Sequence, residues 1–394
     1  MPTTAKSDKT VYIIGAGFSA PAGGPNQSLL LKKIFELSDS NEKTRECQNA
    51  LKQFLINTLC VAPDKLSDVS LEDIYTPIDR CLADGVSLRN MPPSELQVLS
   101  GQIEYLISLA IDRSFESQPI GTSQYVHDFS KYLVNQASIR ATKAENTASA
   151  DAAKKYDPFS IISLNWDILL DKGLHKQLAE HDNSKINEQG DYSPIGVVDY
   201  CCYISSIERG EKRIRSGLWV LGSRGYNVKL LKIHGSMNWL QCSSCQRLFT
   251  SFDEKINIPN YIDAKQCRHC EKYDIDAKLQ GSLVMPTFLK DLSNFQIKLV
   301  WQNAGVELME ATKLVFIGYS LPQADFEFRQ LLSRMVHKNA NIHVVLYKTN
   351  SAKGRRQYTE ERKRYKQFFS GRKITFQPGG VVKFVTELTR PGRS

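Results

Sequence analysis

Short apolar runs recur along the chain and predict buried strands. Continuous apolar runs separated by stretches of helical periodicity are typical of a parallel sheet that is covered on both faces. We therefore expect an α/β fold built on a doubly wound parallel sheet. The runs are VYIIGAG (11–17), FSIISLN (159–165), KLLKIHG (229–235), KLVFIGYS (313–320) and IHVVLYK (342–348).

Residues 18–158 separate the first two runs and contain no clear strand pattern. Helical patterns fill this gap at 28–40, 42–60, 94–116 and 122–138, which predicts a large helical insertion beside the sheet. The expected parts are a first strand and glycine turn (1–27), the helical insertion (28–155), the continued Rossmann-like domain (156–235), a small zinc-ribbon module (236–284) and the C-terminal part of the Rossmann-like domain with a basic helix (285–394).

Composition adds little to this picture. Apolar residues make up 41% and charged residues 24% of the 394 residues, as in ordinary globular proteins. The sequence has no apolar run near the roughly 18 residues that span a bilayer, so we expect no membrane segment. Because the N-terminus MPTTAKSDKT lacks the apolar stretch of a secretory signal, we expect a cytoplasmic protein with reduced thiols.

The net charge of +9 is concentrated in one segment. Lys353–Lys373 contains nine Lys or Arg residues and two Glu. Tyr358, Tyr365, Phe368 and Phe369 recur within it at near-helical spacing, which favours an amphipathic surface helix with a solvated charged face. A basic stripe is also a footprint for nucleic acid, and the sequence leaves that contact open.

The first apolar run leads into a glycine-rich turn, GAGFSAPAGGP. Gly15, Gly17 and Gly23 follow a predicted strand and precede a predicted helix, and Ser19 adds a hydroxyl donor. Glycine at such a turn lets backbone N–H groups approach a pyrophosphate near a helix N-terminus. The spacing differs from the usual dinucleotide pattern, so a merely structural turn is an equal alternative.

Polar side chains follow two more of the predicted strands. Asn165 and Asp167 lie in SLNWD, and His234 lies in KIHGS. Since the carboxyl ends of parallel strands meet at one sheet edge, we expect these residues beside the glycine turn. The alternatives are a helix cap for Asn165 or Asp167 and a structural role for His234.

The most specific motif is a pair of cysteine knuckles, Cys242-x2-Cys245 and Cys267-x2-Cys270. Four cysteines at this spacing in a reduced compartment predict a tetrahedral zinc site. Four thiolates leave no open coordination position, so we expect a structural zinc ion. His269 is either an outward-facing neighbour or an alternative ligand.

In order, GAGFSAPAGGP, SLNWD and KIHGS followed by the two cysteine knuckles resemble the sirtuin superfamily, the silent-information-regulator fold. VFIGYSLPQADFEF (Val315–Phe328) resembles its later glycine-serine turn. The resemblance implies NAD as substrate, with His234 as catalytic base, Asn165 at the nicotinamide ribose and Asp167 near the nicotinamide. The residues that it implies for NAD contacts are Gly15, Ala16, Gly17, Phe18, Ser19 and Gly23 in the first turn and Gly318 and Ser320 in the later one.

The departures from the family pattern point to a divergent branch. Leu164 stands where protein deacylases have Gln, and LVMPTFLKD replaces the loop that clamps acyl-lysine. The helical insertion resembles bacterial members associated with NAD cleavage in antiphage defence. The retained cysteine knuckles are less usual in that branch.

The resemblance thus implies an NAD glycohydrolase that acts as an NAD-depleting antiviral effector. It also implies self-assembly into a homo-oligomer, a partner subunit such as an infection sensor or helicase-type ATPase, or both. An NAD-dependent protein-lysine deacylase is the first alternative, and a non-catalytic NAD or ADP-ribose sensor is the second. The sequence leaves open whether ADP-ribose is cyclised and what triggers the activity.

Overall fold

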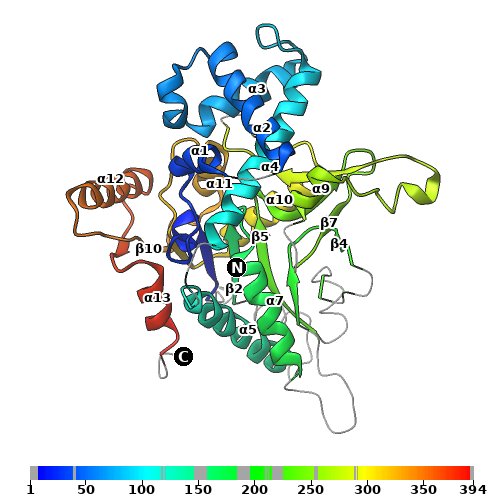
Figure 1. Ribbon diagram of the computed structural model, residues 1–394. Coiled ribbons are helices and arrows are strands. Elements are labelled where there is room, and N and C mark those ends of the chain that lie inside the picture. Colours follow the sequence, from blue (N-terminus) through cyan, green and yellow to red (C-terminus); the bar gives the residue numbers. More distant parts are fainter. Residues whose placement is uncertain are drawn as a thin grey trace.

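The structure is a computed structural model in which parallel strands form one large sheet (Figure 1). It describes residues 8–38, 41–116, 119, 121–145, 158–183, 196–208, 211, 213–214, 225–252, 256–287, 290 and 292–390, with only the backbone for 140–145. Within these residues the large sheet has seven strands in the order β11-β10-β9-β1-β2-β5-β3. The strands are β1 (Thr10–Ile14), β2 (Phe159–Ser163), β3 (Gly196–Asp199), β5 (Tyr226–Lys232), β9 (Lys313–Ile317), β10 (Asn341–Val345) and β11 (Ile374–Gln377).

Strand β1 lies at the centre, where the strand order changes direction. It pairs in parallel with β2 on one side and with β9 on the other, so that Tyr12 lies between Ile161 and Val315. All four residues from Val11 to Ile14 are buried, although alternate side chains point to opposite faces. Both faces of the sheet are therefore covered, and the predicted doubly wound α/β fold is confirmed.

Two sets of helices flank the sheet. Helix α5 (Gln124–Glu145) packs on α7 (Leu169–Asn183), α13 (Gly380–Leu388) and β5, and α10 (Phe295–Glu310) packs on α11 (Phe326–Met335) and β5. Helix α12 (Ala352–Phe368) lies at the left in Figure 1. In the described part of the chain, no helix combines the length and apolarity that crossing a membrane needs.

The helices between β1 and β2 divide into two groups. Those up to Glu116 form a separate hydrophobic core, which we call the helical module (blue to cyan, top of Figure 1). Helix α5 instead joins the core of the sheet, where Phe129 contacts Tyr12 and Tyr125 contacts Phe18. The helical module consists of α1 (Gln27–Glu36), α2 (Glu42–Gln53), the π-helical turn η3 (Phe54–Thr58), the 3-10 turn η4 (Pro63–Asp68), α3 (Leu71–Asp84) and α4 (Pro93–Glu116).

A second, smaller sheet carries the cysteine knuckles. Its order is β4-β7-β6-β8, and it includes β4, which precedes the module boundary at 236 that the sequence suggested. Gly235 connects it to the large sheet with a φ of +70°, and a Cβ there would lie 2.0 Å from the Ser282 carbonyl oxygen. The elements are β4 (Ile204–Ser206), β6 (Gly235–Cys242), β7 (Leu248–Thr250), β8 (Leu279–Leu283), α9 (Asn257–Ile262) and the 3-10 turn η5 (Glu271–Tyr273).

Replacing Gly318 by Ala tests how tightly the two turns at the centre of the sheet pack. Gly318 has a φ of +61°, and its added Cβ would lie 2.3 Å from the Gly17 carbonyl carbon. Gly371 is the matched control, because its φ is +78° but nothing lies within 4 Å of an added Cβ. Gly371→Ala should lower the free energy of unfolding by about 1–2 kcal/mol, the cost of the left-handed backbone alone. Gly318→Ala should lower it clearly further in urea unfolding, and equal losses would contradict the packing.

Candidate functional site

The glycine turn after β1 packs directly against the turn after β9. The N–H of Gly17 donates to the carbonyl oxygen of Gly318 at 2.8 Å, and a Cβ on Gly17 would lie 2.8 Å from the Gly318 Cα. The turn continues through two short 3-10 segments, η1 (Ala16–Phe18) and η2 (Ala20–Ala22), to Gly23, whose φ is +94°. Phe18 points into the core, whereas Ala16 and Gly17 are partly exposed. A ligand can therefore reach the backbone of this turn at the carboxyl end of β1.

Asn165 and Asp167, at the end of β2, are tied to the same turn. The Asn165 amide donates to the Gly15 carbonyl oxygen and to the Ser19 hydroxyl, both at 3.1 Å. Ser19 in turn donates to Asp167 Oδ2 at 2.7 Å. Asp167 Oδ1 also accepts from the N–H of Leu169, the first residue of α7, so the capping alternative holds in part. The three side chains form one connected network.

A buried lysine sits beneath this network. Lys232, at the end of β5, is fully buried and donates to the carbonyl oxygen of Asp167. It also pairs with Asp171 at 3.1 Å, and Tyr200 donates to the other oxygen of Asp171. Burial raises the pKa of Asp167 above its ordinary value, while the charge of Lys232 and the Ser19 hydroxyl oppose the rise. Lys232 therefore stabilises negative charge behind the site.

His234 lies next to Asn165 and is held in one tautomer. Its Nδ1 lies 3.2 Å from the Leu164 carbonyl oxygen, which can only accept, so Nδ1 carries the hydrogen and Nε2 is bare. The side chain is 8% exposed. Burial, and then the charge of Lys290, lower the pKa of His234 to about 4. The imidazole is therefore neutral at physiological pH.

Two charged residues that the sequence reasoning did not single out complete the surroundings of His234. Asp325 Oδ1 lies 3.5 Å from His234 Nε2, and Lys290 Nζ lies 3.3 Å from the same oxygen. Tyr319 donates to Asp325 Oδ2 at 3.0 Å. Burial would raise the pKa of Asp325, but His234 and Lys290 hold it below its ordinary value. Lys290 lies in the stretch LVMPTFLKD, and Asp325 lies in VFIGYSLPQADFEF.

The structure thus gathers the turn residues, Asn165, Asp167 and His234 at the carboxyl edge of the central strands. Gly318 contacts Gly17 directly, and the Ser320 carbonyl oxygen accepts from Arg364 of α12. Neutral imidazole, amide, hydroxyl and carboxylate groups meet here with little solvent access. Such a setting suits proton transfer to a base that is uncharged at neutral pH.

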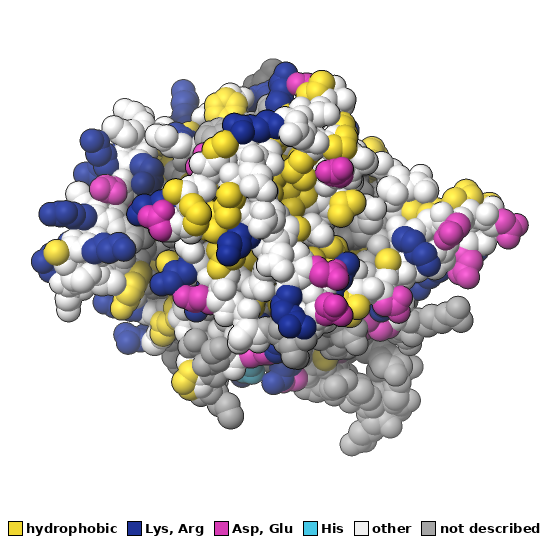
Figure 2. All heavy atoms as spheres, turned by 45° about the horizontal axis from the view of Figure 1, so that its top comes forward, with side chains coloured by type: hydrophobic (Ala, Val, Ile, Leu, Met, Phe, Trp, Pro, Cys, Tyr) yellow, Lys and Arg dark blue, Asp and Glu magenta, His cyan; other side chains and the backbone are white. Residues whose placement is uncertain are grey.

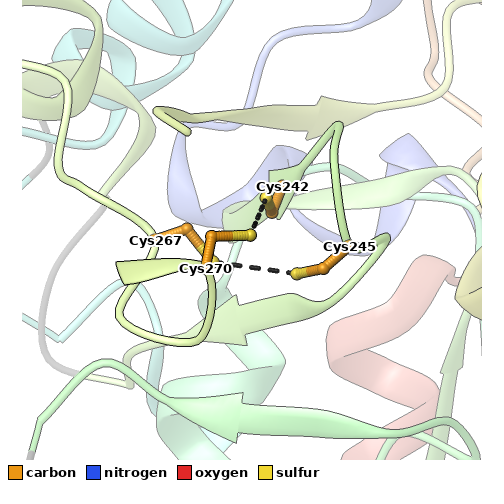
Figure 3. Close-up of side chains that lie close together, drawn as sticks. All are labelled: Cys242, Cys245, Cys267 and Cys270. Atoms are coloured by element: carbon orange, nitrogen blue, oxygen red, sulfur yellow. Dashed lines mark hydrogen bonds between the residues drawn. The ribbon is translucent and has the colours of Figure 1, made fainter. Parts of the chain in front are cut away.

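The four cysteines form a compact cluster at the far end of the small sheet. Cys242 and Cys270 place their Sγ atoms 3.6 Å apart, and those of Cys245 and Cys267 are 3.7 Å apart. All four sulfurs lie within 4.8 Å of one another, and Figure 3 shows them pointing toward a common centre. Sulfurs at about 2.3 Å from a tetrahedral zinc lie about 3.8 Å apart, so the cluster fits this ion. A metal there would join the two knuckles rather than take part in chemistry.

Helix α12 is amphipathic, as its aromatic spacing predicted. Tyr358, Glu361 and Tyr365 are buried, and Figure 2 shows Lys and Arg side chains gathered over the left of the molecule, where α12 lies. The inner face holds the later glycine-serine turn, because Tyr365 donates to the Tyr319 carbonyl oxygen at 2.8 Å. The helix therefore supports the site from behind.

Comparison with known proteins finds distant similarity among solved structures alone. No protein-family model matches the chain, and no curated protein matches it. Among solved structures, a chain described under "The Structural basis of Sirtuin Substrate Affinity" matches with a probability of 1.00, a TM-score of 0.37 and 14% identity. The match covers 97% of this chain and 93% of the other. At so low a TM-score the similarity carries no argument for fold or function.

Metal analysis tests the cysteine cluster. We expect the purified protein to contain about one zinc ion per chain by atomic emission, because one closed four-thiolate set holds one ion. Cys267→Ser should lose the zinc and lower the thermal midpoint. Cys60→Ser is the control, since Cys60 is exposed and outside the cluster. Full zinc content in Cys267→Ser would show that the cluster does not ligate it.

Proposed function

We propose that the protein is an NAD glycohydrolase that cleaves the nicotinamide–ribose bond to give nicotinamide and ADP-ribose. The observation that carries the proposal is the convergence of a glycine turn, an amide and a neutral histidine at one sheet edge. Asn165 bonds the turn through Gly15 and Ser19, and His234 is held by the residue next to Asn165. Open α/β sheets bind ligands at this edge, where the strand order changes direction.

In this proposal the two turns hold the dinucleotide. The turn of Gly15, Ala16 and Gly17 lies against the phosphates, with Phe18, Ser19 and Gly23 shaping it. The Ala16 N–H is the donor to a phosphate, because the N–H groups of Gly15 and Gly17 already donate to Ile317 and Gly318. Gly318 and Ser320 approach the adenine-side ribose. Asn165 contacts the nicotinamide ribose, and Asp167 helps to fix the nicotinamide region.

The chemistry needs a positioned acceptor and a base. Breaking the N-glycosidic bond leaves an oxocarbenium-like ribose, as in ordinary glycoside cleavage. A water oxygen bonds to the ribose carbon, the C–N electron pair leaves with nicotinamide, and the water proton passes to His234 Nε2. A general base of this kind contributes about 10²- to 10⁴-fold.

We further propose that this activity depletes NAD in bacterial antiphage defence, which the resemblance of the helical insertion suggests. Unrestrained NAD hydrolysis would harm the cell that makes the enzyme. Self-association and a partner subunit that senses infection stay predictions, because the structure describes one chain alone.

A second candidate is an NAD-dependent protein-lysine deacylase, which the intact four-cysteine geometry favours. The two activities differ in their acceptor, water in one and an acyl-lysine in the other. Nicotinamide release that depends on an added acyl-peptide would favour the deacylase. Tight NAD binding without any release would favour a sensor instead.

Substitution of the two central residues tests the proposal. His234→Ala should reduce nicotinamide release from NAD at least about 100-fold, because it removes the general base. Asn165→Ala should do the same by losing the ribose contact. His337→Ala is the matched control, since His337 is exposed and lies just beyond the C-terminal end of α11. Release is followed by chromatography, and wild-type rates in both site variants would overturn the assignment.

The pH profile of kcat/KM tests the state of His234. Because its pKa is lowered to about 4, the imidazole stays neutral well below pH 6.5. The wild type should therefore keep nearly all of its neutral-pH rate at pH 5.5, whereas a histidine with an ordinary pKa would keep about a tenth. Circular dichroism at each pH confirms that the fold persists. An acid limb centred near pH 6.5 would contradict the buried, neutral state.

A further inference from the structure

The environment of His234 Nε2 implies a missing hydrogen-bond donor. The bare nitrogen faces Asp325 Oδ1 at 3.5 Å, and both atoms are acceptors. Within the described part of the chain, no group donates to this nitrogen, although the side chain is more than nine-tenths buried. Two facing acceptors in a buried site repel each other unless a donor bridges them.

The Asp325 side chain faces His234 instead of capping its own helix, α11. Asp325 occupies the N-cap of α11, where an aspartate normally accepts from the first-turn N–H groups, yet its side chain makes no capping bond. Tyr319 donates a hydrogen bond to Asp325 Oδ2, and Oδ1 faces His234 and Lys290. The Lys290 backbone N–H also donates to Glu327 of α11, which fixes the lysine beside Asp325.

Water is the molecule that can bridge these two atoms from one side, because at 3.5 Å they lie too close together for an oxygen on the line between them. It carries two hydrogens, one for Nε2 and one for Oδ1, and about 2.8–3.0 Å to each is ordinary for such bonds. A ribose hydroxyl, or any other group with one hydrogen to donate, can bond only one of the two atoms. With both hydrogens held, the lone pairs of the water oxygen point away from the pair of side chains.

The geometry points to Asp325 as a further catalytic residue, which together with His234 binds the attacking water by its two hydrogens. This inference rests on the proposed NAD cleavage and adds a second residue that binds its attacking water. As the water oxygen bonds to the ribose carbon, one hydrogen passes to Nε2 and the other stays on the new hydroxyl, still bonded to Asp325. The C–N electron pair leaves with nicotinamide, and the carboxylate stabilises the imidazolium that forms. Lys290 is a positioning residue that keeps Asp325 ionised.

Competition between water and methanol tests this role with the full chain. Methanol has one donor hydrogen, so the wild type should form ADP-ribose in strong preference to its methyl glycoside. Asp325→Asn should reduce kcat about 100-fold, keep the NAD dissociation constant within about threefold and raise the methanol-to-water product ratio several-fold. Products are resolved by chromatography, and binding is measured by calorimetry.

Tyr319→Phe separates this role from a structural one. It removes the hydrogen bond to Oδ2 but leaves Oδ1 facing His234. The product ratio should therefore stay at the wild-type value in Tyr319→Phe and change in Asp325→Asn. The same shift in both variants would mean that Asp325 acts through packing, and would overturn the inference.

Lys290→Met provides a second test that keeps the carboxylate. Loss of the ammonium raises the pKa of both His234 and Asp325, since Lys290 lowers each of them. Among the residues that the structure describes, His234, Asp325, Lys290 and Tyr319 are the titratable groups that face this position. The acid limb of kcat/KM should move to higher pH, and an unmoved limb would contradict the role of Lys290.

The outcomes distinguish this inference from the proposed function. Absence of nicotinamide release by the wild type would overturn both. Normal wild-type cleavage with an unchanged rate and product ratio in Asp325→Asn would overturn the water-binding role alone.

Discussion

Two backbone turns meet at the centre of the sheet edge with no space between them for a side chain. Gly17 donates to the Gly318 carbonyl oxygen at 2.8 Å, and a Cβ on either residue would come within 2.8 Å of the other backbone. This contact joins the end of β1 to the end of β9, and the Asn165 amide joins the same turn to the end of β2. Three chain segments far apart in sequence are thereby fixed around one small volume. A looser turn at either glycine would move the candidate site residues away from one another.

Buried charge is arranged around this volume rather than within it. Lys232 donates to the Asp167 carbonyl oxygen and pairs with Asp171, and Lys290 lies 3.3 Å from Asp325 Oδ1. The pKa of His234 is lowered because its surroundings exclude water and the charge of Lys290 opposes protonation. The small sheet contributes to the same arrangement, since the Val284 N–H donates to the His234 carbonyl oxygen at 2.9 Å. A zinc ion at the cysteine cluster would therefore stabilise the strand that follows the histidine without touching the reaction.

The sequence predicts the central strands and the glycine turn because continuous apolar runs and closely spaced glycines carry a local signal. It misses β3 and β11, which lie at the two edges of the sheet, because strands of four residues are too short to carry a clear pattern. Helix α5 has the expected helical periodicity, but periodicity alone does not reveal that its apolar face covers the sheet instead of the helical module. Asp325 and Lys290 are missed because their meeting with His234 is a long-range contact. In sequence, Asp325 resembles an ordinary helix cap, and only the absence of a capping bond in the described structure marks it as different.

A crystal structure with bound ADP-ribose tests the convergence of these segments most directly. We predict the pyrophosphate against residues 15–19, the adenine-side ribose near Gly318 and Ser320, and the distal ribose within hydrogen-bond reach of Asn165 and His234. ADP-ribose bound elsewhere, or bound with the distal ribose out of reach of His234, would contradict the account.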